Sequence, residues 1–533
     1  MSLRSSACCS LFLPALLCAQ PFVPLDGVLN GANFLPNCAP NGGVAQGAMF
    51  TITGRDIGPA SLAQVSRFPL TGTLAGVSAR VRMAGTSYDA LPIYASATQV
   101  GAILPSAVPA GEGTLTLTYN GRASEAVPIR VRPSAPGIFT VNSRGNGPAS
   151  VQNIDASGNA VLNSAARPLR PGQLATLWAT GLGPAPGNET AGPIPGDRPE
   201  IETRVWVGDR YARVVYRGRS GCCAGIDQIV FETPAGIEGC QVPINLEAGG
   251  VQSNYGSVAI AAAGECSATR RLPPVNGTAA DFKYGLVIFL DGFGSVLLPG
   301  ALDDYVRLGF FQRGATVGDV EAPLYAFEAN AEVPPGTCAV RYGTEFPAQP
   351  QQPQQLGLDA GTAVNAGAFS LLQSAVNAGR YEDPRRVEIP AGRHRIHNGA
   401  GGRDIGPFAF DADLITVRLH SPGDRIARHQ DLALTWDYAG PAGHLLTIFG
   451  STNSCGRSII SFSCVARASD RRFVVPARIL SLLPPSVNFF GVSNGALNIS
   501  TTAPGGLRRF PAPGLDLGLF LQLSISALRP HYE

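Results

Sequence analysis

The chain repeats itself, and this repeat constrains its fold more than any other feature of the sequence. VLNGA, at residues 28–32, returns as VLNSA at residues 161–165, which is 133 positions further along the chain. Three more matches follow in the same order: GRDIGP (54–59) with TGLGP (180–184), MAGTSYDA (83–90) with WVGDRYAR (206–213), and TQVGAILP (98–105) with DQIVFETP (227–234). Because chance matches would not keep their order, the sequence predicts two structural units in tandem.

Each unit has the pattern of short strands joined by turns. LTLTY (115–119) and RVWV (204–207) are β-prone runs bounded by Gly, Asn and Asp. The 533 residues include 64 Gly and 44 Pro, the two residues that form helices least readily. Turn residues about every ten positions are typical of a β-sandwich, so we predict two immunoglobulin-like sandwiches, at residues 20–132 and 133–267.

The alignment of the two units also predicts which residues occupy equivalent positions. A polar Gln enters an apolar strand in both units, and each of these strands ends at a Pro, which cannot donate to a continuing ladder. The two glycines fall between β-prone runs, where a hairpin turn requires positive φ. The predicted equivalences are Gln99 with Gln228, Gly85 with Gly208, and Tyr88 with Tyr211.

Several of these blocks are similar to one known family. VLNGANF, TQVGAILP, SAPGIF, VLNSAARPLRPGQLATLWATGLGPAPG and DQIVFETPAG resemble the uncharacterised C-terminal domain family described in Solibacter-type acidobacterial proteins, over about residues 24–263. The resemblance implies an exported protein with roughly two immunoglobulin-like units. The family has no assigned activity, so the resemblance implies no catalytic residue.

The rest of the chain is also predicted to be β-rich. DLALTWDYAG (431–440) alternates apolar and polar residues and places Trp436 in a core, and LGLFLQLSISAL (517–528) places its alternate apolar residues on one face. We expect a boundary near residue 425, which divides this half into a β-rich domain (268–425) and a β-sandwich (426–533). The predicted fold class is therefore all-β.

The N-terminus has the pattern of a secretory signal peptide. Arg4 is followed by an apolar run through Leu17 and then by the small residue Ala19, so we predict cleavage after residues 1–19. Cys18 raises the alternative of lipidation, but the bulky Leu17 before it favours simple cleavage. Later apolar runs are too short for a transmembrane segment. The predicted location is secreted or at the cell surface.

Eight cysteines remain once the signal peptide is removed, and an even number in an exported chain indicates disulfides. We expect Cys455 and Cys464 to form a local bridge within a hairpin. Cys240 is expected to pair with either Cys222 or Cys223, which leaves the other member of that adjacent pair for Cys266. The partners of Cys38 and Cys338 stay open.

Four motifs bear on possible chemistry. HRIH (394–397) suggests a metal site, but residues three apart in a strand point to opposite faces. GVSNG (491–495) matches a nucleophile elbow, but the sequence after Ser493 lacks a helix and the only later histidine is His531 near the tail. GAGG (399–402) lacks the frame of a phosphate loop, and FDADL (410–414) has too few carboxylates for a calcium loop of the EF type, although calcium at another sandwich loop stays open.

Aromatic and basic residues bear on possible partners. Tyrosines and tryptophans are expected in cores or at sheet edges, and a surface aromatic pair would instead favour a sugar platform. The net charge is +2 and the arginines are scattered, so no nucleic-acid partner is predicted.

The predicted function is adhesion or another extracellular interaction, with an extracellular protein or polysaccharide as the partner. We predict no enzymatic activity, catalytic residue, metal or cofactor. The alternative is a carbohydrate-directed enzyme or carbohydrate-binding module, with the C-terminal half as the active part. An enzyme should show a pocket with converging carboxylates, whereas an adhesin should show flat faces and loops. A purely structural stalk should lack any exposed apolar or aromatic patch.

Overall fold

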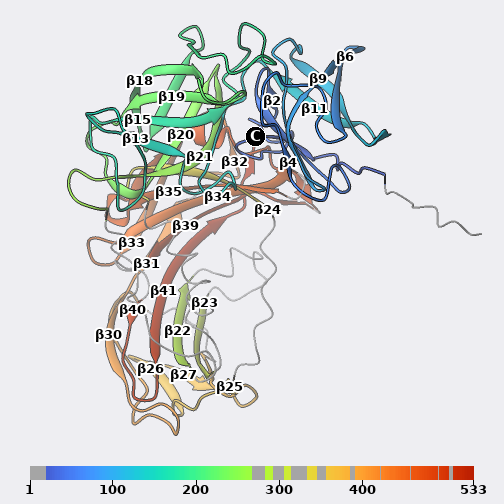
Figure 1. The fold of residues 1–533 in the computed structure, drawn as a ribbon. Coiled ribbons are helices and arrows are strands. Elements are labelled where there is room, and N and C mark those ends of the chain that lie inside the picture. The colour runs from blue at the N-terminus through green and yellow to red at the C-terminus, as the bar shows by residue number, and fades with distance from the viewer. Residues whose placement is uncertain are drawn as a thin grey trace, which may run out of the picture.

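The protein is built almost entirely of β-strands in the computed structural model, as predicted (Figure 1). The structure describes residues 20–266, 282–291, 305–313, 333–344, 356–383, 390–420, 422–455, 458–489, 491–502 and 508–533. The predicted signal peptide, residues 1–19, lies outside these ranges. No helix among the described residues has the length and apolar character needed to cross a bilayer.

The first sandwich consists of two sheets that share one core. One sheet has the order β1(Val28–Asn30), β3(Met49–Thr53), β8(Gln99–Ile103), β7(Leu91–Ala95), β4(Ala63–Gln64). The other has the order β2(Val44–Ala45), β11(Val127–Arg132), β9(Gly111–Tyr119), β5(Val77–Met83), β6(Thr86–Asp89), with β10(Arg122–Ala123) on β9. Phe50, Ile52 and Leu115 are fully buried in the core between the sheets, because strand residues alternate between core and solvent.

The second sandwich has the same layers but joins them through one long strand. Its order is β14(Ala160–Leu162), β13(Val151–Ile154), β15(Leu174–Thr180), β19(Asp227–Glu232), β18(Arg210–Arg219), β17(Thr203–Val207), β20(Gly239–Ala248), β21(Val251–Ile260). The start of β18 pairs with β17 and the remainder pairs with β19, with a bulge between Val214 and Tyr216. In the first sandwich two separate strands make the equivalent pairings: β6 pairs with β5, and β7 pairs with β8. Short strands β12(Gly137–Ile138) and β16(Gly196–Asp197) pair with β15 and β18.

Residues 28–132 and 137–260 form separate sets of sheets, so the tandem-repeat prediction is confirmed. Gln99 lies opposite Thr53, and Gln228 lies opposite Trp178, at corresponding positions of β8 and β19.

The two glycines also lie in corresponding hairpin turns, but the turns differ by one residue. Met83 pairs with Thr86, so Gly85 (φ +88°) is the second residue of its two-residue turn. Val207 pairs with Arg210, so Gly208 (φ +62°) is the first residue of its turn. A shift of one residue turns every following side chain to the other face of the strand.

The third part of the described chain contains a 14-stranded sheet that runs from the sandwiches to a lower lobe (Figure 1). The order of its main path is β24(Cys338–Thr344), β35(Ser458–Arg467), β34(Leu445–Cys455), β39(Ala496–Thr502), β41(Leu517–Leu528), β22(Lys283–Asp291), β23(Tyr305–Arg313), β28(Arg380–Glu382), β27(Phe369–Gln373), β26(Ala363–Ala366), β29(Gly392–His397), β30(Ala409–Leu414). Two short strands, β25(Leu356–Gly357) and β40(Arg508–Arg509), pair with β23 and β41.

Smaller elements complete this part of the chain. A three-stranded sheet has the order β31(Thr416–His420), β33(Leu432–Ala439), β36(Arg472–Val475). Two-stranded sheets pair β32(Arg425–Ile426) with β42(His531–Tyr532) and β37(Asn488–Phe489) with β38(Val492–Ser493). A single helical turn, α3(Ala477–Leu480), follows β36.

The expected boundary near residue 425 does not separate the sheets. β24 pairs with β35, and β22 pairs in parallel with β41, so strands from both sides of residue 425 share one sheet. The prediction was wrong here because it relied on local pattern, whereas these pairings join segments more than a hundred residues apart. The two core predictions are confirmed: Trp436 is 2% exposed, and Leu519, Leu521 and Leu523 of β41 lie in one cluster while Phe520 packs in another.

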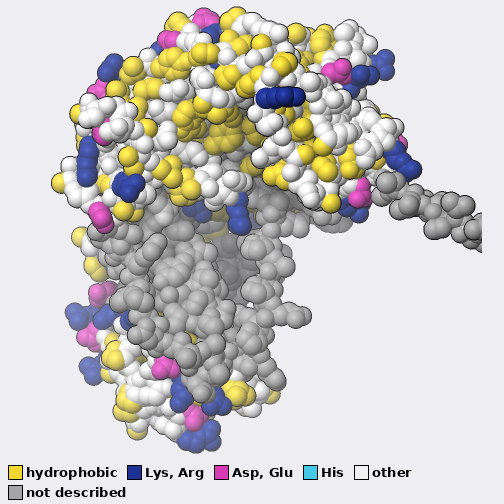
Figure 2. All heavy atoms as spheres, viewed as in Figure 1, with side chains coloured by type: hydrophobic (Ala, Val, Ile, Leu, Met, Phe, Trp, Pro, Cys, Tyr) yellow, Lys and Arg dark blue, Asp and Glu magenta, His cyan; other side chains and the backbone are white. Residues whose placement is uncertain are grey.

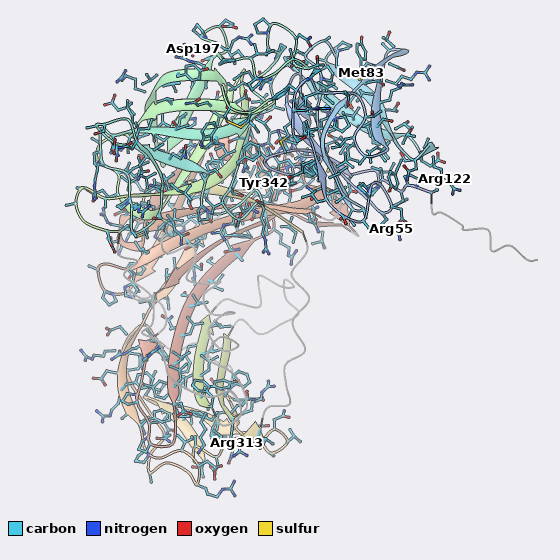
Figure 3. All side chains as sticks on the ribbon, viewed as in Figure 1. Arg55, Met83, Arg122, Asp197, Arg313 and Tyr342 are labelled. Atoms are coloured by element: carbon cyan, nitrogen blue, oxygen red, sulfur yellow. A yellow bond between two sulfur atoms is a disulfide. The ribbon has the colours of Figure 1, made fainter. Side chains whose placement is uncertain are left out.

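Three parts of the chain meet around Tyr342 (Figure 3). Asn41 of the first sandwich donates to the Gln252 carbonyl (2.9 Å) of the second and to the Tyr342 hydroxyl (3.1 Å) of β24. Asn146 of the second sandwich donates to the Tyr342 carbonyl (2.9 Å). Burial raises the pKa of Tyr342, so its phenol stays neutral and hydrogen-bonded at this junction.

Candidate binding surface

An aromatic pair with tilted rings lies on the face of the second sandwich that points away from its core. Trp206 of β17 and Tyr211 of β18 are directly opposite each other across the hairpin, and their ring centroids are 3.6 Å apart. Val205 and Val207 fill the core, so the alternation of the strand directs Trp206 outward. The Tyr211 side chain is 55% exposed. The expectation that aromatic residues lie in cores or at edges is therefore wrong for this pair.

The shifted hairpin turn explains why Tyr211 faces the solvent. Tyr88 and Tyr211 both lie in the strand that follows the turn, as the repeat predicted. Tyr88 lies opposite Val81 and packs against the core of the first sandwich. Because the turn of the second sandwich is displaced by one residue, Tyr211 lies on the other face of its strand.

Charged side chains flank the aromatic pair on both sides. The Arg478 guanidinium of α3 lies over the Trp206 ring, 4.2 Å from its centroid. Arg204 lies 5.9 Å from the Tyr211 centroid and forms an ion pair of 3.3 Å with Glu247. The indole Nε1 of Trp206 donates to the same Glu247 carboxylate at 3.4 Å. These contacts hold the Trp206 ring in place.

Residues of the neighbouring strands position Arg478. Its guanidinium donates to the Tyr255 hydroxyl at 3.0 Å, and its carbonyl accepts a hydrogen bond from Gln252 Nε2 at 2.7 Å. Burial raises the pKa of Tyr255 to about 12, and the adjacent Arg478 opposes this shift. The phenol is therefore neutral at ordinary pH. Arg478 links the third part of the chain to the second sandwich and covers one face of Trp206, which leaves Tyr211 as the accessible part of the pair.

This arrangement offers an aromatic face with hydrogen-bonding groups beside it. Aromatic faces pack against flat apolar surfaces such as those of sugar rings, and the nearby Arg204 and Glu247 offer hydrogen bonds to polar groups at the edges. Two concave sites formed by described residues have no Asp or Glu in their lining. Within the described ranges, no group of three or more His, Cys, Asp or Glu is arranged to hold a metal ion. On the face shown in Figure 2, hydrophobic side chains gather over the two sandwiches and charged ones are scattered.

The expected disulfide between Cys455 and Cys464 is wrong. Cys464 of β35 is bonded to Cys338, which lies directly opposite it on β24. Within the β34–β35 hairpin, Cys455 lies opposite Ser458, whereas Cys464 lies opposite Ile448. Cys455 and Ile448 are seven residues apart along β34, which corresponds to roughly 23 Å in a strand. The cysteine spacing correctly indicates a hairpin, but the turn is not midway between the two cysteines.

The other expected cysteine pairings also differ in the structure. Cys240 is bonded to Cys266, with a Cα–Cα distance of 5.5 Å, and not to Cys222 or Cys223. Cys222 and Cys223 are bonded to each other. We expected these adjacent cysteines to have two different partners, because a bridge between neighbours is uncommon. No signal in the sequence indicates the bridge between Cys222 and Cys223. Cys38 is also disulfide-bonded.

The GVSNG and HRIH motifs lie in ordinary strands and turns. Ser493 ends β38, donates to the Pro530 carbonyl at 2.7 Å, and is followed by β39, where a nucleophile elbow would need a helix. His531 lies in β42. His394 is hydrogen-bonded to the Pro390 carbonyl (2.8 Å), and His397 accepts from the Gly399 amide (3.2 Å). Each imidazole thus makes its own local contact.

The two carboxylates of the FDADL motif, Asp411 and Asp413, both lie in β30. Asp411 forms an ion pair of 3.1 Å with Arg393 of the neighbouring strand β29. This contact gives Asp411 a structural partner within the sheet.

No protein-family model matches the chain, and no curated protein matches it. Among solved structures, the chain is similar to domains 4–9 of the surface layer protein SbsC, at 13% identity and a TM-score of 0.18, over 95% of this chain and 65% of that one. It therefore spans slightly less than two thirds of that structure. A second similar structure is the Bacteroides ovatus mixed-linkage glucan utilization locus SGBP-B in complex with a mixed-linkage heptasaccharide (10% identity, TM-score 0.14, 82% of this chain and 87% of that one).

The four N-terminal Ig domains of Dscam1 isoform 8.4 are also similar, at 10% identity and a TM-score of 0.11, over 92% of this chain and 96% of that one. At these identities and TM-scores, the similarities carry no argument about what this chain binds.

Proposed function

We propose that this chain is an exported recognition protein of the cell surface or extracellular medium, and that it binds polysaccharide through the Trp206–Tyr211 pair. The basic, apolar and small-residue pattern of residues 1–19 supports export. Paired sandwiches present their loops and sheet faces to partners, which suits adhesion or another extracellular interaction.

The single observation that carries the proposal is the cross-strand aromatic pair, in which Tyr211 is exposed and Trp206 is partly buried. Apolar aromatic surface costs free energy when it stays in water, so an exposed tyrosine ring held against an ordered tryptophan is informative. Trp206 is held from both sides, by Arg478 and by Tyr211, and is therefore ordered before any ligand arrives. A rigid aromatic surface binds without first losing side-chain entropy, which favours affinity.

The geometry favours binding over catalysis. A glycosidase needs two carboxylates on opposite sides of the scissile bond, and Glu247 beside Trp206 is engaged by Arg204. The proposal therefore places the protein among non-catalytic binders, and it moves the binding surface from the C-terminal half of the chain to the second sandwich. A protein ligand would also use Trp, Tyr and Arg as its main contacts.

Affinity gel electrophoresis against soluble polysaccharides tests this proposal. The panel includes mixed-linkage β-glucan, xylan, mannan and dextran, with the mature wild-type protein as reference. We expect at least one polysaccharide to retard the wild type, and Tyr211→Ala to weaken that interaction about tenfold, because removing a central aromatic contact costs about 1–2 kcal/mol. Tyr211→Phe keeps the ring and should retain most of the affinity.

Val215→Ala is the matched control, since Val215 is exposed on the same strand but outside the aromatic pair. It should bind as the wild type does. Equal retardation of wild type and Tyr211→Ala by every polysaccharide would remove the pair from the binding surface. If no polysaccharide retards the wild type, the ligand class is wrong, and a protein ligand becomes the next candidate.

A further inference from the structure

A groove lies where the two sandwiches meet, and its lining residues do not include the aromatic pair. It is a groove of about 310 Å³, which is near the lower end of the usual range for small-ligand pockets. One wall comes from the segment between β4 and β5 and from β7, and the other wall comes from the loop between β18 and β19. Its apolar lining consists of Val65, Phe68, Leu70, Ile93, Ala224 and Ile226.

Buried polar contacts fix the two walls relative to each other. The Arg219 guanidinium, at the end of β18, donates to the carbonyls of Gly47 and Gly183, both at 2.7 Å, and pairs with the buried Asp227 carboxylate. The Leu70 amide donates to the Thr190 carbonyl at 2.7 Å. The Arg219–Gly47 and Leu70–Thr190 hydrogen bonds both join one sandwich to the other. The groove between them is therefore formed before a ligand binds.

The charge at the groove has one sign. Arg67 lines the groove and is exposed, and it makes no hydrogen bond or ion pair with the part of the chain that the structure describes. The lining residues include no Asp or Glu. A guanidinium beside apolar walls in a site without carboxylates favours an anionic group, because the pair forms charge-assisted hydrogen bonds.

The disulfide between Cys222 and Cys223 shapes the second wall. Because the two cysteines are adjacent, the bridge closes a ring within two residues and restricts the loop that carries Cys223, Ala224 and Ile226. The Ser220 hydroxyl contacts Cys222 Sγ at 2.9 Å, while Cys223 lines the groove. Divalent sulfur is polarisable and makes favourable contacts with aromatic rings.

We propose that this groove binds a small amphiphilic anion, with an aromatic or short apolar body against the walls and one carboxylate or sulfonate against Arg67. Three independent features support the ligand class: the apolar lining, the Arg67 cation, which is unpaired within the described ranges, and the Cys222–Cys223 bridge in the wall. The site uses residues that are distinct from Trp206 and Tyr211, so it goes beyond the polysaccharide-binding function.

A fluorescence titration of the mature protein with 8-anilinonaphthalene-1-sulfonate tests the proposal. This probe combines an aromatic body with a sulfonate, and its emission rises in apolar surroundings. We expect saturable binding to the wild type, weakened about tenfold or more by Arg67→Gln and much less by Arg67→Lys, which keeps the charge. Ala224→Leu should weaken binding several-fold, because the larger side chain occupies part of the groove.

Arg82→Gln is the matched control, because Arg82 is an exposed arginine of β5 in the same sandwich and does not line the groove. Its affinity for the probe should equal that of the wild type. The uncharged analogue N-phenyl-1-naphthylamine should bind the wild type and Arg67→Gln with similar affinity.

Two results would overturn the proposal. If both Arg67→Gln and Ala224→Leu bind the sulfonate as the wild type does, the probe binds elsewhere and the groove is not a ligand site. If Arg67→Gln weakens the uncharged analogue as much as the sulfonate, Arg67 supports the wall of the groove and does not pair with an anion. Retention of polysaccharide binding by these variants would separate either outcome from failure of the proposed function.

Discussion

Tyr255 shows how a single side chain can connect two parts of the molecule. Its ring is 4% exposed and belongs to the core of the third part, although the residue lies in β21 of the second sandwich. Its hydroxyl accepts a hydrogen bond from Arg478, whose guanidinium also covers Trp206. The phenol must stay neutral, because burial penalises the phenolate.

The raised pKa of Tyr255 predicts a loss of stability at alkaline pH. The pKa is about 12 in the folded protein, against 10.0 for the free group, so both states are neutral below about pH 10 and stability is full there. Above that pH the unfolded state loses its proton first, so the free energy of unfolding falls as pH rises towards 12. Urea unfolding of the wild type and of Tyr255→Phe, from about pH 9 to about pH 11, measures this effect.

Tyr255→Phe keeps the ring but cannot ionise. We expect it to be about 1 kcal/mol less stable than the wild type near pH 9, because it lacks the hydrogen bond with Arg478. Its stability should then fall less steeply with pH. Parallel curves for the two proteins would show that Tyr255 is not the titrating group.

The sequence predicts the equivalent positions of Gln99 and Gln228, but it does not predict which face of its strand Tyr211 occupies. Both glutamines lie at the start of an apolar strand in a fixed register, so their positions follow from the repeat. Tyr211 depends on whether glycine is the first or second residue of a two-residue turn, and both choices are compatible with Gly in that position. The candidate binding surface results from this single-residue difference, which the alignment alone does not reveal.

At the scale of elements, the disulfide between Cys338 and Cys464 fixes a long-range strand pair. It joins β24 to β35 across a sequence separation of 126 residues. A cross-link that closes a long loop restricts the unfolded chain more than one that closes a short loop. For this bridge, the loop-entropy model gives a stabilisation of about 4–5 kcal/mol. We expect Cys338→Ala/Cys464→Ala to lower the free energy of unfolding by a large part of that amount.

Chemical denaturation of this double variant measures the loss, and peptide mapping without reduction identifies the bridge itself. The map should contain a peptide that links Cys338 to Cys464 and another that links Cys240 to Cys266. The matched control, Cys222→Ser/Cys223→Ser, removes a bridge between neighbours and should change stability much less, because it closes almost no loop. A peptide linking Cys455 to Cys464 would contradict the observed register of the hairpin.

Elements with local partners are predicted from the sequence, and elements with distant partners are not. The β34–β35 hairpin and the two faces of β41 follow from apolar alternation and turn residues. The parallel pairing of β22 with β41 and the pairing of β24 with β35 have no local signal. The expected boundary at residue 425 was wrong for the same reason, since it assumed that each segment completes its own sheet.

At the scale of the whole molecule, the three parts are joined by polar contacts and by an apolar cluster in which Ala39 of the first sandwich and Tyr255 of the second pack into the core of the third part. Asn41 and Tyr342 connect all three parts, Arg219 connects the two sandwiches, and Arg478 connects the second sandwich to the third part. Such contacts hold the sandwiches in one orientation. The aromatic pair lies beside Arg478 at the edge of one of these junctions, so the docking of the third part also orders the proposed binding surface.

The central claim is that polysaccharide binds at the Trp206–Tyr211 pair, and ligand-induced change in tryptophan fluorescence tests it most directly. The three tryptophans have different environments: Trp206 is in the pair, Trp178 lies in β15 with its Nε1 hydrogen-bonded to Gln152, and Trp436 is buried. With a polysaccharide that retards the wild type, we predict a fluorescence change in the wild type and in Trp178→Phe, and loss of that change in Trp206→Phe. A change that persists in Trp206→Phe and disappears in Trp178→Phe would contradict the claim.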